Sequence, residues 1–125
     1  MLEVGILGSQ QITVSEDKLA SVWKSGTLDV FATPAMIALM EQTCANSVQM
    51  HLDAGFSTVG ISVNIVHTRA TPKGMTVHVN STLTEIDRKR LVFHVEAFDE
   101  KGKIGEGTHE RFIIDTEKFM EKVMS

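Results

Sequence analysis

The sequence is poor in several features, and each shortage excludes a class of protein. Cys44 is the only cysteine among 125 residues, so neither an internal disulfide nor a cysteine-based zinc site can form. Basic residues do not predominate. The formal net charge is −4, whereas binding to nucleic acid or to an anionic membrane requires a basic surface. No apolar run approaches the roughly 20 residues that span a bilayer. We therefore expect neither nucleic acid nor membrane as a partner.

The chain also lacks repeats, low-complexity tracts and proline-rich linkers, with two prolines in all. Its 125 residues and 42% hydrophobic content fit a single domain over residues 1–125 with a real core. The start MLEVGILGSQQ has no basic segment followed by a long apolar one, so it does not resemble a secretory signal. We expect a cytoplasmic protein.

The clearest predicted element is a helix over residues 33–52. Thr33 is suited to cap it, Pro34 to open its first turn, and Gly55 follows its end. At about 100° per residue, the apolar side chains fall on one stripe. This stripe contains Met36, Ile37, Met40, Cys44, Ser47, Val48 and His51, with Gln42, Asn46 and Gln49 opposite. Glu41 falls at the edge of the stripe, where the helix meets its support.

Four strand-like segments follow at residues 58–69, 75–86, 91–99 and 103–115, separated by ATPKG, DRKR and DEKG. Breaks this short and polar favour antiparallel connections, so we expect a meander. QQITVS predicts a short strand, EDKLASVWKS a brief helix and TEKFMEKVM a terminal helix. The order indicates an α+β fold in which an antiparallel sheet wraps one long helix. The long uncharged segments FSTVGISVNIV and TVHVNSTL predict a homodimer, or a larger homo-oligomer, through a strand edge.

Three side chains are candidates to carry chemistry. His67 ends an apolar row on the helix-facing side of its strand; it is either a proton-transfer group or a core histidine bonded to a backbone carbonyl. Glu41 is either a solvated acid or a functional carboxylate at the helix boundary. Thr33 is a helix cap, and a helix N-terminus can also bind an anion.

Thr33 and Glu41 are eight residues apart, which separates their backbones by about 12 Å along a helix. One small substrate could not easily contact both within one chain. Across a two-fold axis, residues of one subunit can meet those of the other in a shared groove. We therefore hypothesise a site between subunits.

Three blocks, VFATPAMIALME, VGISVNIVHTRATPKGMTVHV and GEGTHERFIID, occur in order with intervening lengths kept. Together they resemble the hotdog-fold acyl-CoA thioesterases, specifically the fluoroacetyl-CoA thioesterase-like family. The resemblance covers nearly everything from Val30 to Val123. It implies a dimeric hotdog fold and hydrolysis of an acyl-CoA thioester.

The resemblance also implies the site residues. Thr33, Glu41 and His67 would form the catalytic group, the Gly60 amide would help to bind the thioester oxygen, and Arg111 would lie near the site or the coenzyme. Glu41 could attack the carbonyl or deprotonate a water, a choice that the sequence leaves open. Glycine in a strand independently permits close backbone approach to a ligand, although it is also common at bulges.

The chain departs from the family pattern in one segment. The specialised fluoroacetyl-CoA enzyme has a phenylalanine-bearing lid just before its catalytic threonine, whereas this chain reads KSGTLDVFAT, with Lys24 and Thr27 in place of aromatics. We therefore predict a hydrolase of small acyl-CoA thioesters without clear fluoroacetyl selectivity.

Two functions other than hydrolysis remain as alternatives. A dimer that binds acyl-CoA or another small ligand without cleaving it is compatible with the same scaffold, because fold does not fix function. A hydratase or dehydratase acting on acyl-CoA would need an acid shortly after its histidine. The four residues after His67 are Thr-Arg-Ala-Thr, which counts against this function.

No cofactor and no metal site are predicted, because the remaining histidines are scattered without acidic partners at ligand spacing. These histidines are His51, His78, His94 and His109. Five cations at the ends of strands have two possible roles. They either bind the coenzyme phosphates or are only solvated residues of turns. They are Arg69, Lys73, Arg88, Lys89 and Arg90.

Overall fold

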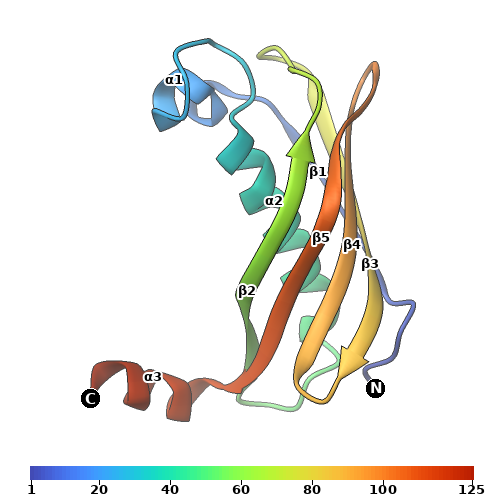
Figure 1. The fold of residues 1–125 in the computed structure, drawn as a ribbon, viewed down its shortest axis with the longest axis vertical. Helices are drawn as coiled ribbons and strands as arrows, with labels where there is room; N and C mark the ends of the chain where they lie inside the picture. Colours follow the sequence, from blue (N-terminus) through green and yellow to red (C-terminus); the bar gives the residue numbers. More distant parts are fainter.

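The computed structural model describes residues 1–125 and packs one long helix against one face of a curved five-stranded antiparallel sheet (Figure 1). The strands are β1 (Leu7–Thr13), β2 (Phe56–His67), β3 (Thr76–Asp87), β4 (Arg90–Asp99) and β5 (Gly102–Asp115). The helices are the 3-10 turn η1 (Glu16–Lys18), α1 (Ala20–Trp23), α2 (Thr33–Gln49) and α3 (Thr116–Met124). The expected α+β fold is confirmed. No helix combines the length and the apolar character needed to cross a membrane.

The buried face of α2 includes Met36, Met40, Cys44 and Val48 of the predicted stripe and extends beyond it to one side, whereas Ile37 and Ser47 are only half-buried and His51 lies beyond the helix. This buried face contains Ala35, Met36, Leu39, Met40, Thr43, Cys44 and Val48. The predicted polar face with Gln42, Asn46 and Gln49 is exposed, and Glu41 is half-buried at the boundary, as expected. These side chains pack on alternate residues of the neighbouring strands, including Leu91, Phe93, Val95 and Ala97 of β4. Helical and strand periodicity therefore meet in one core.

Two expectations about the ends of α2 are wrong. Ala32 is the capping residue, so Pro34 stands at the second helical position, and no side chain caps the first turn. The Thr33 hydroxyl is instead bonded to His67. At the other end α2 stops at Gln49, three residues early, because the His51 and Leu52 amides bond to carbonyls three residues back rather than four.

The long strands end within two residues of their predicted limits, but the meander is wrong at one connection. β3, β4 and β5 are consecutive neighbours, whereas β2 pairs with β5, which gives the order β1-β3-β4-β5-β2. ATPKG is therefore part of a crossover and not a hairpin. Within it the Thr71 carbonyl accepts the Phe31 amide at 2.8 Å, and Pro72 pairs with Val30. The crossover thus fixes the chain that leads into α2.

β2 is a free edge of the sheet, as expected for FSTVGISVNIV. Its side chains Ile61, Val63 and Val66 are 52%, 48% and 55% exposed. TVHVNSTL, the other expected edge, lies in β3 and is wrongly assigned, because β3 is paired on both sides by β1 and β4. A long, uncharged and apolar edge such as β2 is a template for pairing with another chain.

Candidate active site

Thr33 and His67 meet where α2 begins and β2 ends. Oγ1 of Thr33 lies 2.7 Å from Nδ1 of His67. The pair borders a cavity of about 260 Å³ that Val30 and Phe31 also line. Nε2 of His67 is buried and has no protein partner, which is unusual for a buried nitrogen. Burial lowers the pKa of His67 below its ordinary value, so the imidazole is neutral at pH 7 and can accept a proton.

Glu41 lies about two turns further along α2, against Gly60 of β2. A Cβ placed on Gly60 would lie 2.9 Å from Oε2 of Glu41. The same point is 3.3 Å from Nη1 of Arg111 and 3.3 Å from Cε1 of His109. A carboxylate, a guanidinium and an imidazole therefore surround one point on the helix-facing side of Gly60. We call these four residues the Gly60 cluster. A β-bulge follows directly, between Gly60 and Ser62, and bulges are frequent next to active sites.

Arg111 is buried, with 8% of its surface exposed. Its Nε donates to Oγ1 of Thr58 at 2.8 Å, and its Nη2 donates to the Thr58 carbonyl oxygen at 2.9 Å. Burial lowers the pKa of Arg111, and the nearby Glu41 carboxylate acts in the opposite direction. Because an arginine titrates far above neutrality, the guanidinium stays charged at pH 7. A fixed positive charge therefore stands beside Glu41.

His109 is the residue of the Gly60 cluster that sequence reasoning missed. It is 1% exposed and stands two residues before Arg111 on β5. Side chains two apart on a strand share a face, so the spacing of His109 and Arg111 in THERF carried the signal.

The Thr33–His67 pair and the Gly60 cluster lie apart within one chain. Thr33 and Glu41 are separated by about 12 Å of helix, and Gly60 and His67 stand near opposite ends of β2. The expectation that Thr33 and Glu41 cannot share a small substrate within one chain agrees with this spacing.

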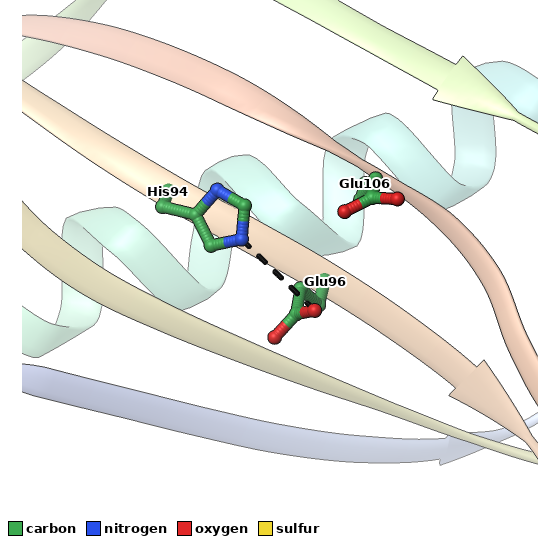
Figure 2. Close-up of side chains that lie close together, drawn as sticks. All are labelled: His94, Glu96 and Glu106. Atoms are coloured by element: carbon green, nitrogen blue, oxygen red, sulfur yellow. Dashed lines mark ion pairs between the residues drawn. The ribbon is translucent and has the colours of Figure 1, made fainter.

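A third cluster contradicts the expectation that no remaining histidine has acidic partners at ligand spacing. His94 and Glu96 of β4 and Glu106 of β5 lie together on the sheet face away from α2 (Figure 2). Their ligand atoms all lie within 4.8 Å of one another. However, Nζ of Lys103 is 2.6 Å from Oε2 of Glu96 and 3.2 Å from Oε1 of Glu106. The lysine already pairs with both carboxylates, so a metal ion would have to displace it.

Most cations considered for the coenzyme phosphates are already in ion pairs. Arg69 pairs with Asp99 at 2.9 Å and Lys73 with Glu16 at 2.6 Å. Arg90 pairs with both Glu85 and Glu110. Arg88, whose side chain is 93% exposed, has only a 3.7 Å approach to Asp87. Arg88 and its neighbour Lys89 are thus the least committed cations of the set.

Comparison with known proteins finds thioesterases among the relatives of this chain. Residues 14–117 match the sequence model of the family described as fluoroacetyl-CoA-specific thioesterase. A fluoroacetyl-CoA thioesterase of Streptantibioticus cattleyicolor is 42% identical over 95 residues, which cover 76% of this chain and 68% of that protein.

Solved structures agree with the sequence comparison. The structure of the fluoroacetyl-CoA thioesterase FlK superposes with a TM-score of 0.94 at 34% identity, covering 99% of this chain and 96% of the other. A point mutant of FlK in complex with fluoroacetate and CoA superposes with a TM-score of 0.89 at 34% identity, covering 94% of this chain and 99% of the other.

Proposed function

Because this chain belongs to the fluoroacetyl-CoA-specific thioesterase family, we propose that it is a thioester hydrolase that cleaves a small acyl-CoA to the free acid and CoA. The observation that carries the proposal is the convergence of Glu41 and Arg111 on one point beside Gly60. A thioester carbonyl at that point would meet a carboxylate and a positive charge together. CoA is the leaving group by analogy with the relative whose structure contains fluoroacetate and CoA.

Each site residue has a role in this hydrolysis. Glu41 either attacks the thioester carbon or removes a proton from a water that attacks it. The carbon–sulfur bond then breaks, and His67 passes to the CoA thiolate a proton that it has taken from the attacking water. If Glu41 attacks first, that water instead hydrolyses the acyl–Glu41 anhydride and supplies the proton. Thr33 orients His67 through the 2.7 Å hydrogen bond. The Gly60 amide and the Arg111 charge stabilise the negative oxygen that forms on the carbonyl.

The two separated clusters can complete one site if two copies pair along β2. Residues directly opposite each other in an antiparallel pair point to the same face, and successive side chains alternate between faces. A two-fold axis must therefore lie where one residue is opposite its own copy. An axis at Asn64 sets Val63 opposite Ile65 of the second copy. The β-bulge between Gly60 and Ser62 puts one extra residue into β2. When this extra residue is left out of the count, His67 lies opposite Gly60 of the second copy. We therefore propose a homodimer with two shared sites.

Disulfide trapping tests this assembly. Asn64→Cys places two thiols on the proposed axis and should give a cross-linked dimer under mild oxidation. Ser9→Cys on the exposed edge strand β1 is the matched control and should stay uncrosslinked. A chain that runs as a monomer by light scattering, or that cross-links through Ser9→Cys alone, would contradict pairing along β2.

The segment before Thr33 supports a site without clear fluoroacetyl selectivity. From the start of α1 to Val30 the only aromatic residue is Trp23, which ends α1. Its Nε1 donates to the carbonyl oxygen of Asp17 at 2.6 Å, and its ring lines a different cavity from His67. Only Phe31 contributes an aromatic ring next to His67. A cavity wall without a second ring has no evident means to distinguish fluoroacetyl from acetyl or propionyl groups.

Thiol release from a panel of acyl-CoA esters tests the function. Acetyl-, fluoroacetyl-, propionyl- and butyryl-CoA should all release CoA, with kcat/KM values within about 200-fold of one another, the upper end of the discrimination that one methylene in an apolar pocket typically gives. Tight binding of the esters without thiol release would instead identify a ligand-binding dimer. A preference for fluoroacetyl-CoA far above this range would overturn the proposed lack of selectivity.

A further inference from the structure

His109 is a fully buried titratable group that the roles above leave unused. It lies on β5 with its ring stacked against Phe93, at 6.4 Å between ring centroids and 28° between planes. Both ring nitrogens are hydrogen-bonded. Nδ1 is 2.8 Å from the Ser62 carbonyl oxygen, and Nε2 is 3.1 Å from Nη1 of Arg111.

The partners fix the protonation state of this ring. A carbonyl oxygen can only accept, so Nδ1 must carry the hydrogen that it donates to Ser62. A guanidinium can only donate, so Nε2 of His109 must present a lone pair to Arg111. His109 is therefore neutral and held in a single tautomer. Protonation would add a hydrogen to Nε2 and set it against the N–H of Arg111.

His109 completes the support of the Arg111 guanidinium. Two of its nitrogens are held by Thr58, and the third, Nη1, is held by His109. Nη1 is the guanidinium atom 3.3 Å from the point over Gly60. The contact with His109 therefore adds the third bond that keeps the planar guanidinium, and with it the Nη1 donor, at that point.

We propose that His109 is a positioning residue: its neutral imidazole holds Nη1 of Arg111 at the face of Gly60, so that the guanidinium is aimed at the substrate carbonyl. The proposal rests on the thioesterase function proposed above. His109 approaches the point over Gly60 only with its carbon Cε1, at 3.3 Å, so it offers the substrate carbonyl no hydrogen bond and acts through Arg111.

The hydrogen bond between His109 and Arg111 is sensitive to acid. Arg111 on the same strand opposes protonation of His109, whereas Glu41 of α2 and Glu110 favour it. Cys44 of α2, which lies near Arg111, is an uncharged thiol because burial raises its pKa to about 12. Burial chiefly lowers the pKa of His109 below its ordinary value of 6.5. The ring therefore keeps its lone pair at neutral pH and loses it only as the pH falls below 6.5.

Two substitutions separate the acceptor at Nε2 from the ring itself. In His109→Gln, the amide oxygen can take the position of Nε2 and accept from Arg111, but it cannot titrate. In His109→Asn, the shorter side chain keeps a donor for Ser62 and loses the acceptor for Arg111. His78→Asn is a matched control, because His78 is bonded to Ser9 on the other side of the sheet.

We expect His109→Asn to lower kcat about 10- to 100-fold, the scale of a displaced catalytic contact, with KM changed less than about threefold. His109→Gln should retain most of kcat and should lose the part of the acid limb of the pH profile that His109 causes. His78→Asn should behave as the wild type. Wild-type kcat in His109→Asn, or an unchanged acid limb in His109→Gln, would overturn the proposal.

A second measurement does not depend on turnover. Two-bond ¹H–¹⁵N correlation spectra of ¹⁵N-histidine-labelled protein should show His109 at pH 7 with a protonated Nδ1 and an unprotonated Nε2. The opposite tautomer, or a cationic ring, would refute the proposal even in an active enzyme. If the wild type releases no thiol while this tautomer is found, the proposed hydrolysis fails and the arrangement of His109 stands.

Discussion

Gly60→Ala is the most direct probe of the site, because a methyl group would enter the point on which the Gly60 cluster converges. The added Cβ would lie 2.9 Å from Oε2 of Glu41 and 3.3 Å from Nη1 of Arg111. Real Cβ contacts are almost never shorter than 3 Å, so the Glu41 carboxylate must move. It is the far end of a flexible side chain and can turn aside at small cost.

The expected effects on activity and stability are therefore unequal. Because the methyl group occupies the position proposed for the thioester carbonyl, kcat/KM should fall by at least about a hundredfold, which corresponds to about 2.7 kcal/mol of transition-state stabilisation. The free energy of unfolding should fall by only about 1 kcal/mol, the lower end of the range for overpacking.

Gly107→Ala provides the matched comparison one strand away. Its added Cβ would lie 2.1 Å from the Asn64 carbonyl oxygen and 2.7 Å from the Cα of Ile65. Both are backbone atoms, so β2 and β5 must separate. The free energy of unfolding should fall by about 3 kcal/mol, and Tm by on the order of 10 °C.

Thiol release and thermal unfolding, measured on both variants, test this reasoning. Two results would refute it: Gly60→Ala with kcat/KM within twofold of the wild type, or a loss of Tm in Gly60→Ala equal to that in Gly107→Ala. The first would remove the substrate carbonyl from Gly60. The second would make Gly60 a packing residue only.

Three further predictions concern neighbouring groups. Glu41→Gln should lower kcat by at least about a hundredfold while the elution volume of the protein is unchanged; unaltered thiol release would exclude Glu41 from the chemistry. Thr33→Val should lower kcat by about tenfold, because His67 loses its 2.7 Å partner, and Thr33→Ser should restore it; equal loss in both variants would show that the hydroxyl is not the active feature. Burial acts to raise the pKa of Asp99, but the Lys101 and Gly102 amides, Thr71 and Arg69 outweigh it and lower the pKa. Asp99→Asn should therefore lower the free energy of unfolding, measured in urea at pH 7, by about 2 kcal/mol. The loss should shrink as the pH falls through the lowered pKa of Asp99, because the wild-type carboxylate stabilises the fold only while it is ionised. A loss that is constant from pH 7 to pH 3 would contradict this assignment.

Much of the architecture could be predicted from local patterns. The helical stripe around Met36 and Met40 and the alternation in β3 to β5 depend only on which side chains avoid water at each period. The partner of β2 could not be predicted in the same way. ATPKG has the composition of a hairpin turn, and only the packing of the whole sheet against α2 shows that the chain crosses over instead.

The candidate site divides along the same line. The sequence by itself determined which chemical groups are available, and the resemblance of its three blocks to a family indicated Thr33, Glu41, His67, Gly60 and Arg111. It could not show that the Thr33 hydroxyl leaves the helix cap for His67, because the two residues are 34 positions apart and meet only through the crossover.

Tertiary structure alone decided the environment of those groups. It buried Arg111 and His109 between β2 and α2, fixed the tautomer of His109 through Ser62, and separated the two clusters along β2. The physical reason is that charge, tautomer and reach depend on neighbours that folding brings from other strands. Residue types set what a side chain can donate or accept, and the fold sets what it meets.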